Sequence, residues 1–282
     1  REWGDGTEDP AVFRPTSLDP GQWVRAVKAA GMTGLILTCK HHDGFCLWPS
    51  KYTTHTVAAS PYPGAVVAET AAACRAGGIR FGIYLSPWDR NQPCYGSGQA
   101  YNDYFVNQLT ELLTGYGEIF AVWLDGACGE GANGKVQAYD WERYYATIRR
   151  LQPNACIHVC GPDVRWCGNE AGITRPSEWS VVPLRMRDTE KIAHESQQAD
   201  NAEFRQRKLA ASDQDLGSRA VLQDEQELIW YPAEVDTSIR PGWFYHAQED
   251  SQVKTTEELF QTYLRSVGGN STLLLNIPPA PN

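Results

Sequence analysis

Polar residues with catalytic potential follow several short apolar runs in this chain. His41 and His42 come just after the run TGLILT, Asp125 ends the run EIFAVWL, and Glu170 lies in the segment GNEAG near two tryptophans. Burial raises the pKa of a carboxyl group, so two carboxyls in different surroundings can divide the roles of acid and nucleophile. Asp125 and Glu170 are therefore a candidate pair for cleaving a glycosidic bond.

Each candidate also has a simpler interpretation. Asp125 can cap the turn that follows its apolar run, Glu170 can be a solvated loop residue, and Glu178 lies close enough in sequence to compete with it for the acid role. The two adjacent histidines can donate hydrogen bonds to sugar hydroxyls, pack in the core or bind a metal ion. Neighbouring residues of a strand point to opposite faces, and no third ligand follows at helical spacing, so we expect no metal site.

Composition excludes some classes of partner. The 282 residues carry a net charge of -9 and have no Lys/Arg-rich run, so we predict no nucleic-acid partner. No apolar stretch approaches the roughly 20 residues that cross a bilayer, so no membrane partner is predicted either. Ten Trp and thirteen Tyr mildly favour a carbohydrate site, although on composition alone an aromatic core is the better interpretation.

The eight cysteines give no metal or redox motif. None forms a C-x-x-C pair, so the spacings typical of zinc and thioredoxin-like sites are absent, and most are expected to be buried. The cysteines do not define a compartment. The chain begins at Arg1, without a Met, which suggests the interior of a longer product.

Apolar runs alternate with helical patterns. The predicted strands are Thr33–Thr38, Arg80–Ser86, Glu118–Leu124, Ala155–Val159, Ser177–Val182, Glu227–Tyr231 and Thr272–Ile277. The predicted helices are Asp19–Ala30, Ala65–Ala76, Tyr101–Leu113, Trp141–Leu151 and Thr256–Val267. This alternation predicts an α/β fold with parallel strands. The polar stretch 185–226 is expected to be a surface helix or an excursion loop.

Seven predicted strands are one fewer than a closed eight-stranded barrel needs. The polar opening EWGDGTEDP resembles the loop after a first strand, so we expect that strand to lie before Arg1. An open doubly wound sheet is the alternative, but the chain has neither a G-x-G-x-x-G motif after a first strand nor a P-loop. In a barrel, the active site forms at the carboxyl ends of the strands, where the candidate residues occur.

Several long motifs resemble those of family-29 α-L-fucosidases. They run in order from residue 2 to residue 279: EWGDGTEDP, CKHHDGFCLWPS, YLSPWDRN, VWLDGACGEG, RWCGNEAG, SIRPGWFYH and LLLNIPP. The GNEAG and RPGWFYH segments resemble the subgroup that prefers α-1,3- and α-1,4-linked fucose on branched glycans. The resemblance implies a retaining exo-hydrolase on a (β/α)8-like barrel, without metal or cofactor.

The same resemblance implies roles for individual residues. Asp125 takes the position of the nucleophile and Glu170 that of the acid/base, with Glu249 and Asp250 as the fallback for the acid/base. The positions that match sugar-binding motifs are Glu2, Trp3, His41, His42, Tyr84, Asp89, Trp166, Arg240 and Trp243. Fucose carries a methyl group on C5, and the apolar side chains available to contact it are Phe45, Trp48 and Trp243.

The chain also departs from the family pattern. A first strand with a His-containing motif and a C-terminal β-sandwich are both absent, so we expect residues 1–282 to be one catalytic barrel truncated at its N-terminus. The expected partner is a fucosylated oligosaccharide or glycoprotein glycan. A secreted, periplasmic or lysosome-like compartment is expected before the cytoplasm. The alternatives are a non-catalytic fucose-binding barrel and a hydrolase of a related sugar, such as an α-L-galactoside.

Overall fold

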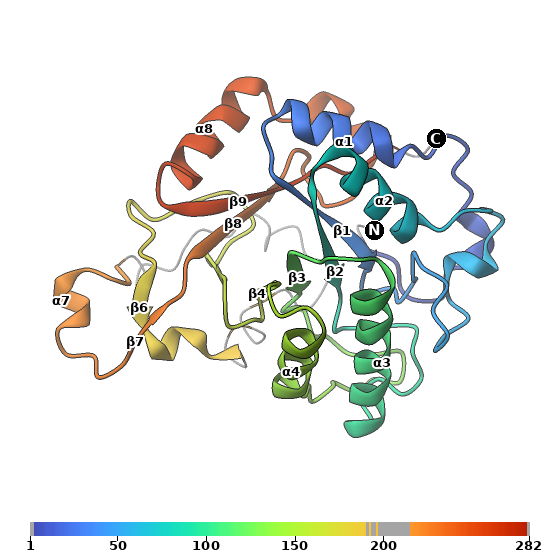
Figure 1. Ribbon diagram of the computed structural model, residues 1–282, viewed down its shortest axis with the longest axis horizontal. Helices are drawn as coiled ribbons and strands as arrows, with labels where there is room; N and C mark the ends of the chain where they lie inside the picture. The colour runs from blue at the N-terminus through green and yellow to red at the C-terminus, as the bar shows by residue number, and fades with distance from the viewer. Residues whose placement is uncertain (1–2, 190–191, 193–195, 197–214, 281–282) are drawn as a thin grey trace.

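The computed structural model of the chain describes residues 3–189, 192, 196 and 215–280. Its parallel strands form a four-stranded sheet and a three-stranded sheet (Figure 1). The first sheet runs in the order β1 (Gly34–Lys40), β2 (Arg80–Leu85), β3 (Ala121–Leu124) and β4 (Cys156–Val159). The second runs in the order β5 (Arg165–Trp166), β8 (Ala233–Ser238) and β9 (Ser271–Asn276).

A single parallel bridge between His158 and Val164 links the two sheets through β4 and β5. The outer strands are then β1 and β9, and within the described ranges no strand pairs with their free edges. The predicted α/β class with parallel strands is confirmed. A closed eight-stranded ring is not seen in the described residues.

Helices lie outside the strands (Figure 1). The α-helices are α1 (Pro20–Ala29), α2 (Val66–Gly77), α3 (Gln99–Gly115), α4 (Trp141–Leu151), the short α7 (Arg219–Leu222) and α8 (Thr256–Ser266). The 3-10 turns are η1 (Pro10–Val12), η2 (Val57–Ala59), η3 (Leu184–Arg187) and η5 (Ala247–Gln252). The five predicted helices are confirmed within a few residues.

Local chemistry explains where these helices begin and end. The Asp19 carboxylate accepts a hydrogen bond from the Gln22 N–H at the start of α1, and a capping box between Thr255 and Glu258 begins α8. Gly78 ends α2 with a φ of 69°, which a residue without a Cβ adopts at little cost.

Two predicted strands do not join the parallel sheets. The segments predicted as strands at 177–182 and 227–231 instead form a two-stranded antiparallel ribbon, β6 (Val181–Pro183) and β7 (Leu228–Trp230). The parallel strands that the sequence analysis missed are β5, which has only two residues, and β8. The sequence of β8, AEVDTS, lacks an apolar run because Glu234 and Asp236 are buried within it.

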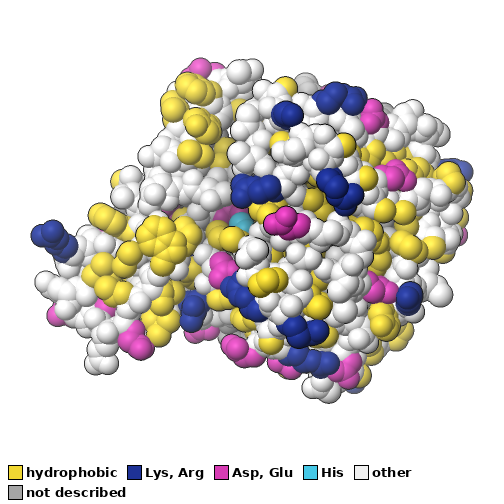
Figure 2. All heavy atoms as spheres, in the orientation of Figure 1, with side chains coloured by type: hydrophobic (Ala, Val, Ile, Leu, Met, Phe, Trp, Pro, Cys, Tyr) yellow, Lys and Arg dark blue, Asp and Glu magenta, His cyan; other side chains and the backbone are white. Residues whose placement is uncertain are grey.

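The main apolar core fills the space between β1–β4 and helices α2, α3 and α4. Figure 2 shows apolar side chains exposed over the β6–β7 ribbon and over α8, where Trp230 and Phe260 are each more than half exposed. Of the predicted excursion at 185–226, the structure describes residues 185–189, 192, 196 and 215–226. No described helix is both long and apolar enough to cross a membrane.

Candidate active site

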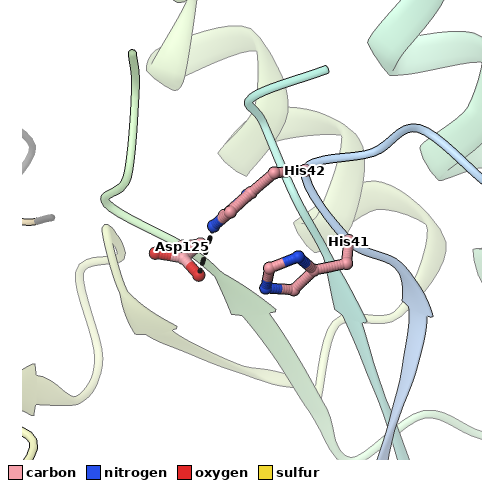
Figure 3. A group of neighbouring side chains, drawn as sticks. All are labelled: His41, His42 and Asp125. Atoms are coloured by element: carbon pink, nitrogen blue, oxygen red, sulfur yellow. Dashed lines mark ion pairs between the residues drawn. The ribbon is translucent and has the colours of Figure 1, made fainter. Parts of the chain in front are cut away.

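The carboxyl ends of β1, β2 and β3 bring four of the predicted site residues together. Asp125 directly follows β3, and His41 and His42 directly follow β1 (Figure 3). The Tyr84 hydroxyl donates to Asp125 Oδ2 at 2.6 Å, and the Ala127 N–H donates to Asp125 Oδ1 at 2.9 Å. Both oxygens of the carboxylate are therefore oriented by the protein, while 20% of the Asp125 side chain stays exposed.

Tyr84 is itself held in place by Trp123 of β3. The two rings stack with centroids 5.2 Å apart. Burial raises the pKa of the Tyr84 phenol well above its usual range, and the charge of Asp125 raises it further. Burial and the neighbouring charge therefore favour the protonated phenol, which is the form that donates to Asp125.

The His42 ring presents a lone pair toward Asp125. Ser86 Oγ donates its one proton to the Trp88 carbonyl at 2.7 Å, so the 2.7 Å contact with His42 Nδ1 requires that Nδ1 carry the hydrogen. Nε2 then has none, and it lies 3.8 Å from Asp125 Oδ2. Burial, assisted by the charges of Arg90 and Lys40, lowers the pKa of His42 to about 3, so the ring is neutral.

His41 completes the group drawn in Figure 3. Burial lowers the pKa of His41 well below its usual range, with a smaller contribution from His42. Its ring stacks on Tyr84 with centroids 5.7 Å apart. Within the described part of the chain, one trio of possible metal ligands, His41, His42 and Asp125, has its atoms within 4.8 Å of one another. Two neutral imidazoles and a carboxylate suit either the hydroxyls of a sugar or a divalent cation.

Trp3 adds a buried donor beside the histidines. Its ring lies edge-on to His42 with centroids 4.8 Å apart and is only 4% exposed. Trp3 Nε1 has no hydrogen-bond partner among the described residues. A buried N–H without a partner costs free energy, so a ligand oxygen at this position would be stabilised. The predicted neighbour Glu2 lies outside the described residues.

Asp89 lies in a buried ion pair. Its Oδ2 is 2.9 Å from Lys40 Nζ, and the two side chains are 1% and 0% exposed. Its Oδ1 accepts hydrogen bonds from the N–H groups of Asn91 and Gln92, at 3.0 and 2.9 Å. These bonds connect the end of β1 to the loop after β2. They account for the burial of Asp89.

Glu170 sits in a tightly bonded loop after β5. The Asn169 side chain accepts from the N–H groups of Ala171 and Ile173 at 3.0 and 3.1 Å. Trp243 Nε1 donates to Glu170 Oε2 at 3.1 Å. The charge of Glu170 is also one of the causes that raise the pKa of Tyr84. The candidate acid therefore interacts electrostatically with the group that holds Asp125.

Glu178 anchors the far end of this loop and is not available as an acid. Its two oxygens contact Arg165 at 3.0 Å and Arg175 at 3.2 Å, and its side chain is fully buried. Both oxygens are bound by guanidinium groups inside the core, where a substrate cannot reach them. The alternative that Glu178 takes the acid role is therefore wrong.

The loop after β8 connects the two halves of the site. Besides the bond from Trp243 to Glu170, the Phe244 ring packs edge-on against His41 with centroids 5.0 Å apart. Asn276, the last residue of β9, donates to the Trp243 carbonyl at 2.8 Å. Arg240 Nη2 donates to Asp250 at 2.7 Å, which stabilises the loop, whereas the buried Arg240 Nε has no partner in the described structure.

Other predicted residues make contacts within the protein. Trp166 Nε1 donates to Asp236 Oδ1 at 2.9 Å. Trp48, suggested for the sugar methyl group, is a core residue whose Nε1 donates to Glu111, and Phe45 packs against Phe13. Glu249, the fallback acid, lies in η5 and has a buried Oε2 without a partner in the described structure.

The sequence analysis missed several residues that organise the site. They are Ser86, Trp123, Asn169, Glu234, Asp236 and Phe244. Phe244 lies inside the motif RPGWFYH, and Ser86 lies inside YLSPWDRN. The sequence motifs therefore contained the signal that could have identified both residues. Glu234 and Asp236 belong to the strand that the apolar pattern did not reveal.

One family model matches nearly the whole chain. The family model described as α-L-fucosidase matches residues 7–282. Alpha-L-fucosidase 1 of Arabidopsis thaliana is 45% identical over 285 residues, which cover 99% of this chain and 50% of that protein. The chain thus spans about half the length of the curated relatives it matches.

Solved structures share the fold. A Bacteroides ovatus ATCC 8483 protein with a solved crystal structure is 53% identical in sequence to this chain. The two structures superpose with a TM-score of 0.87, and the match covers 99% of this chain and 47% of that chain. A Ruminococcus gnavus GH29 fucosidase in complex with fucose is 31% identical, with a TM-score of 0.77 over 99% of this chain and 58% of that chain.

Proposed function

The chain belongs to the α-L-fucosidase family, and from that premise we propose that it is the catalytic part of a retaining α-L-fucosidase that uses Asp125 as nucleophile. The observation that carries the proposal is the orientation of the Asp125 carboxylate. Tyr84 and the Ala127 N–H bind its two oxygens, and it stays partly exposed at the end of β3. A carboxylate fixed in this way is ready to attack without further ordering.

In the first proposed step, an Asp125 oxygen forms a bond to the anomeric carbon of fucose. The bond from that carbon to the leaving-group oxygen breaks, and Glu170 gives its proton to this oxygen. The bond from Trp243 to Glu170 Oε2 orients the acid. The products are a covalent fucosyl-enzyme and the rest of the glycan.

In the second step, Glu170 takes a proton from water while the water oxygen attacks the anomeric carbon. The bond to Asp125 breaks, and fucose leaves with its original anomeric configuration. In the reacting complex we expect the two carboxyl groups to lie about 5–5.5 Å apart, since no water has to fit between nucleophile and sugar.

Neutral groups around Asp125 are suited to binding sugar hydroxyls. His42 Nε2 offers an acceptor and Trp3 Nε1 offers a buried donor on the same side of the site. Because both histidines are uncharged, they compete little with the substrate for the Asp125 carboxylate. Trp243 and Phe244 supply aromatic surface for the C5 methyl group.

The finer points of the proposal concern fold and substrate. A single bridge joins the two sheets, and β1 and β9 have free parallel edges in the described structure, which supports a (β/α)8-like barrel. The proposed substrates are branched oligosaccharides or glycoprotein glycans with α-1,3- or α-1,4-linked fucose. We propose that the protein is secreted or resides in the periplasm or a lysosome-like compartment, where such glycans occur.

A substrate panel tests the proposal. The protein that carries this chain should release nitrophenol from an aryl α-L-fucoside far faster than from the α-L-galactoside or α-L-arabinoside. It should also cleave a branched Lewis trisaccharide faster than linear 2'-fucosyllactose. Preference for the galactoside would change the substrate, and fucose binding without turnover would support a non-catalytic barrel. Equal cleavage of both glycans would refute the linkage preference alone.

A further inference from the structure

Ser86 carries a buried hydroxyl that the proposed mechanism does not use. It directly follows β2, and its backbone N–H donates to the Lys40 carbonyl at 3.0 Å, at the end of β1. This bond holds Ser86 beside the segment that carries His42. The residues Ser86 and His42 are 0% and 1% exposed, so water does not take the place of either partner.

A chain of two hydrogen bonds runs from the His42 ring to the backbone. Ser86 Oγ donates its hydrogen to the Trp88 carbonyl at 2.7 Å. In its 2.7 Å contact with His42 Nδ1, the same oxygen is therefore the acceptor and Nδ1 the donor. A neutral imidazole has one hydrogen, so the bond made at Nδ1 decides that Nε2 carries a lone pair.

Packing fixes the orientation of the same ring. His42 lies between Trp3, edge-on with centroids 4.8 Å apart, and Trp88, with centroids 4.9 Å apart. Trp88 is itself held by its Nε1, which donates to the Glu130 carbonyl at 3.0 Å. His42 Nε2 therefore points toward Asp125 Oδ2 at 3.8 Å, which is too far for a hydrogen bond (Figure 3).

This tautomer has consequences for the sugar and for the nucleophile. The Nε2 lone pair accepts a hydrogen bond only from a group that brings its own hydrogen, such as a sugar hydroxyl. In the opposite tautomer, an Nε2 hydrogen would point at Asp125. A hydrogen bond to a carboxylate stabilises its negative charge, and the attack on the anomeric carbon consumes that charge.

We propose that Ser86 is a positioning residue that fixes the tautomer of His42, so that Nε2 accepts a hydrogen bond from a hydroxyl of the fucose ring and does not donate to Asp125. This inference rests on the proposed function. It makes the site selective for a sugar that presents a hydrogen-bond donor to Nε2, because an acceptor at that place would meet the lone pair of the ring.

Ser86→Ala tests the inference in the protein that carries this chain. Without the hydroxyl, an Nδ1 hydrogen would be buried without a partner, so the ring should move its hydrogen to Nε2, next to Asp125. Nitrogen NMR of isotope-labelled histidine reads the tautomer directly, and the spectrum of His42→Gln assigns the signal. The kcat/KM for an aryl fucoside should fall about tenfold, the value of one hydrogen bond. An Nδ1 hydrogen that persists in Ser86→Ala, or a changed tautomer with unchanged kcat/KM, would overturn the inference.

Ser266→Ala is the matched control. Ser266 is also 0% exposed, and its Oγ donates to the Thr262 carbonyl at 2.6 Å, within α8. The control removes a buried hydroxyl of the same size on the outer helix, so kcat, KM and the His42 signal should all stay as in the wild type. An equal loss of kcat/KM in both variants would mean that Ser86 acts only through stability.

Binding of fluorinated sugars identifies the hydroxyl that His42 contacts. Fucose and its 2-, 3- and 4-deoxyfluoro analogues are titrated calorimetrically into the wild type and Ser86→Ala. Fluorine accepts but does not donate, so one analogue should bind the wild type about tenfold more weakly than fucose does. Ser86→Ala should discriminate less against that analogue, because the two changes remove the same hydrogen bond. Losses that add at all three positions would contradict the inference.

Asp125→Gly separates this inference from the proposed function. If that variant is inactive while Ser86→Ala retains the wild-type tautomer, Ser86 has no such role and the function stands. If Asp125→Gly keeps its turnover, the function fails, whatever the tautomer of His42. Should Ser86→Ala not fold, the wild type decides by NMR. Its Nε2 should carry no hydrogen and its signal should move when fucose is added, whereas a protonated Nε2 or an unmoved signal would refute the proposal.

Discussion

Replacing Asp89 by Asn tests whether its carboxylate supports the fold or contacts the sugar. Asp89 Oδ2 lies 2.9 Å from Lys40 Nζ, and both side chains are essentially inaccessible to solvent. The substitution leaves the Lys40 ammonium buried without its counter-ion, although Gln108 Oε1 still accepts from it at 2.9 Å. Removing one partner of a buried ion pair costs about 3–5 kcal/mol of unfolding free energy.

That cost is large against the roughly 5–15 kcal/mol that stabilises a typical domain. At about 2–4 °C per kcal/mol for a domain near this size, the melting temperature should fall by about 6–20 °C. Calorimetry of Asp89→Asn, Lys40→Met and the double variant measures the effect. Because the two groups interact directly, the double variant should lose less stability than the sum of the single variants.

Asp103→Asn is the matched control. Asp103 also pairs with a cation, Arg143, but the two side chains are 51% and 37% exposed. Solvent screens such a pair, so its loss should lower the melting temperature far less than Asp89→Asn does. The reasoning is refuted if Asp89→Asn melts within about 2 °C of the wild type and instead raises KM for an aryl fucoside, since Asp89 would then act on the sugar.

Three further predictions concern the chemistry of the site. Glu170→Ala should lose about 10²–10⁴-fold of kcat/KM on natural glycans and less on aryl fucosides, and azide should partly restore turnover of the aryl substrate; equal loss on both substrates would point to Glu249. The unfolded His42 binds a proton near its ordinary pKa of 6.5, whereas the folded ring does so only at about 3. Its contribution to stability is therefore complete above about pH 6.5 and declines as the pH falls toward 3. In urea titrations, the unfolding free energy of His42→Gln should fall less between these pH values than that of the wild type. An equal fall in both proteins would mean that the folded ring titrates normally. Dialysis against EDTA should leave fucoside hydrolysis unchanged, because Asp125 is oriented by Tyr84 and the Ala127 N–H; activity that is lost on dialysis and restored by zinc would contradict this.

Strongly patterned features could be predicted from the sequence. Continuous apolar runs revealed β1 to β4 and β9, and capped amphipathic segments revealed the helices. Because the carboxyl ends of neighbouring parallel strands meet at one edge, the order of the apolar runs was enough to group His41, His42, Tyr84 and Asp125.

The remaining features depend on contacts between distant residues. Strand β8 has no apolar run, since its buried acids are stabilised by Trp123, His158 and Trp166 from other strands. The runs at 177–182 and 227–231 had suitable composition for the parallel sheets, but they pair with each other in a ribbon. Asp89 has the residue type of a sugar ligand, and only the structure reveals its partner Lys40.

Covalent trapping tests the central claim, that Asp125 is the nucleophile, most directly. The protein that carries this chain is incubated with a 2-deoxy-2-fluoro fucosyl fluoride. This reagent forms the fucosyl-enzyme faster than water hydrolyses the fucosyl-enzyme, so the covalent intermediate accumulates. The protein is then digested, and the labelled peptide is sequenced by mass spectrometry, with Asp125→Gly as the control. The account predicts one fluorofucosyl group on Asp125 and none in the variant. A label on another carboxylate, or steady turnover of aryl fucoside by Asp125→Gly, would contradict it.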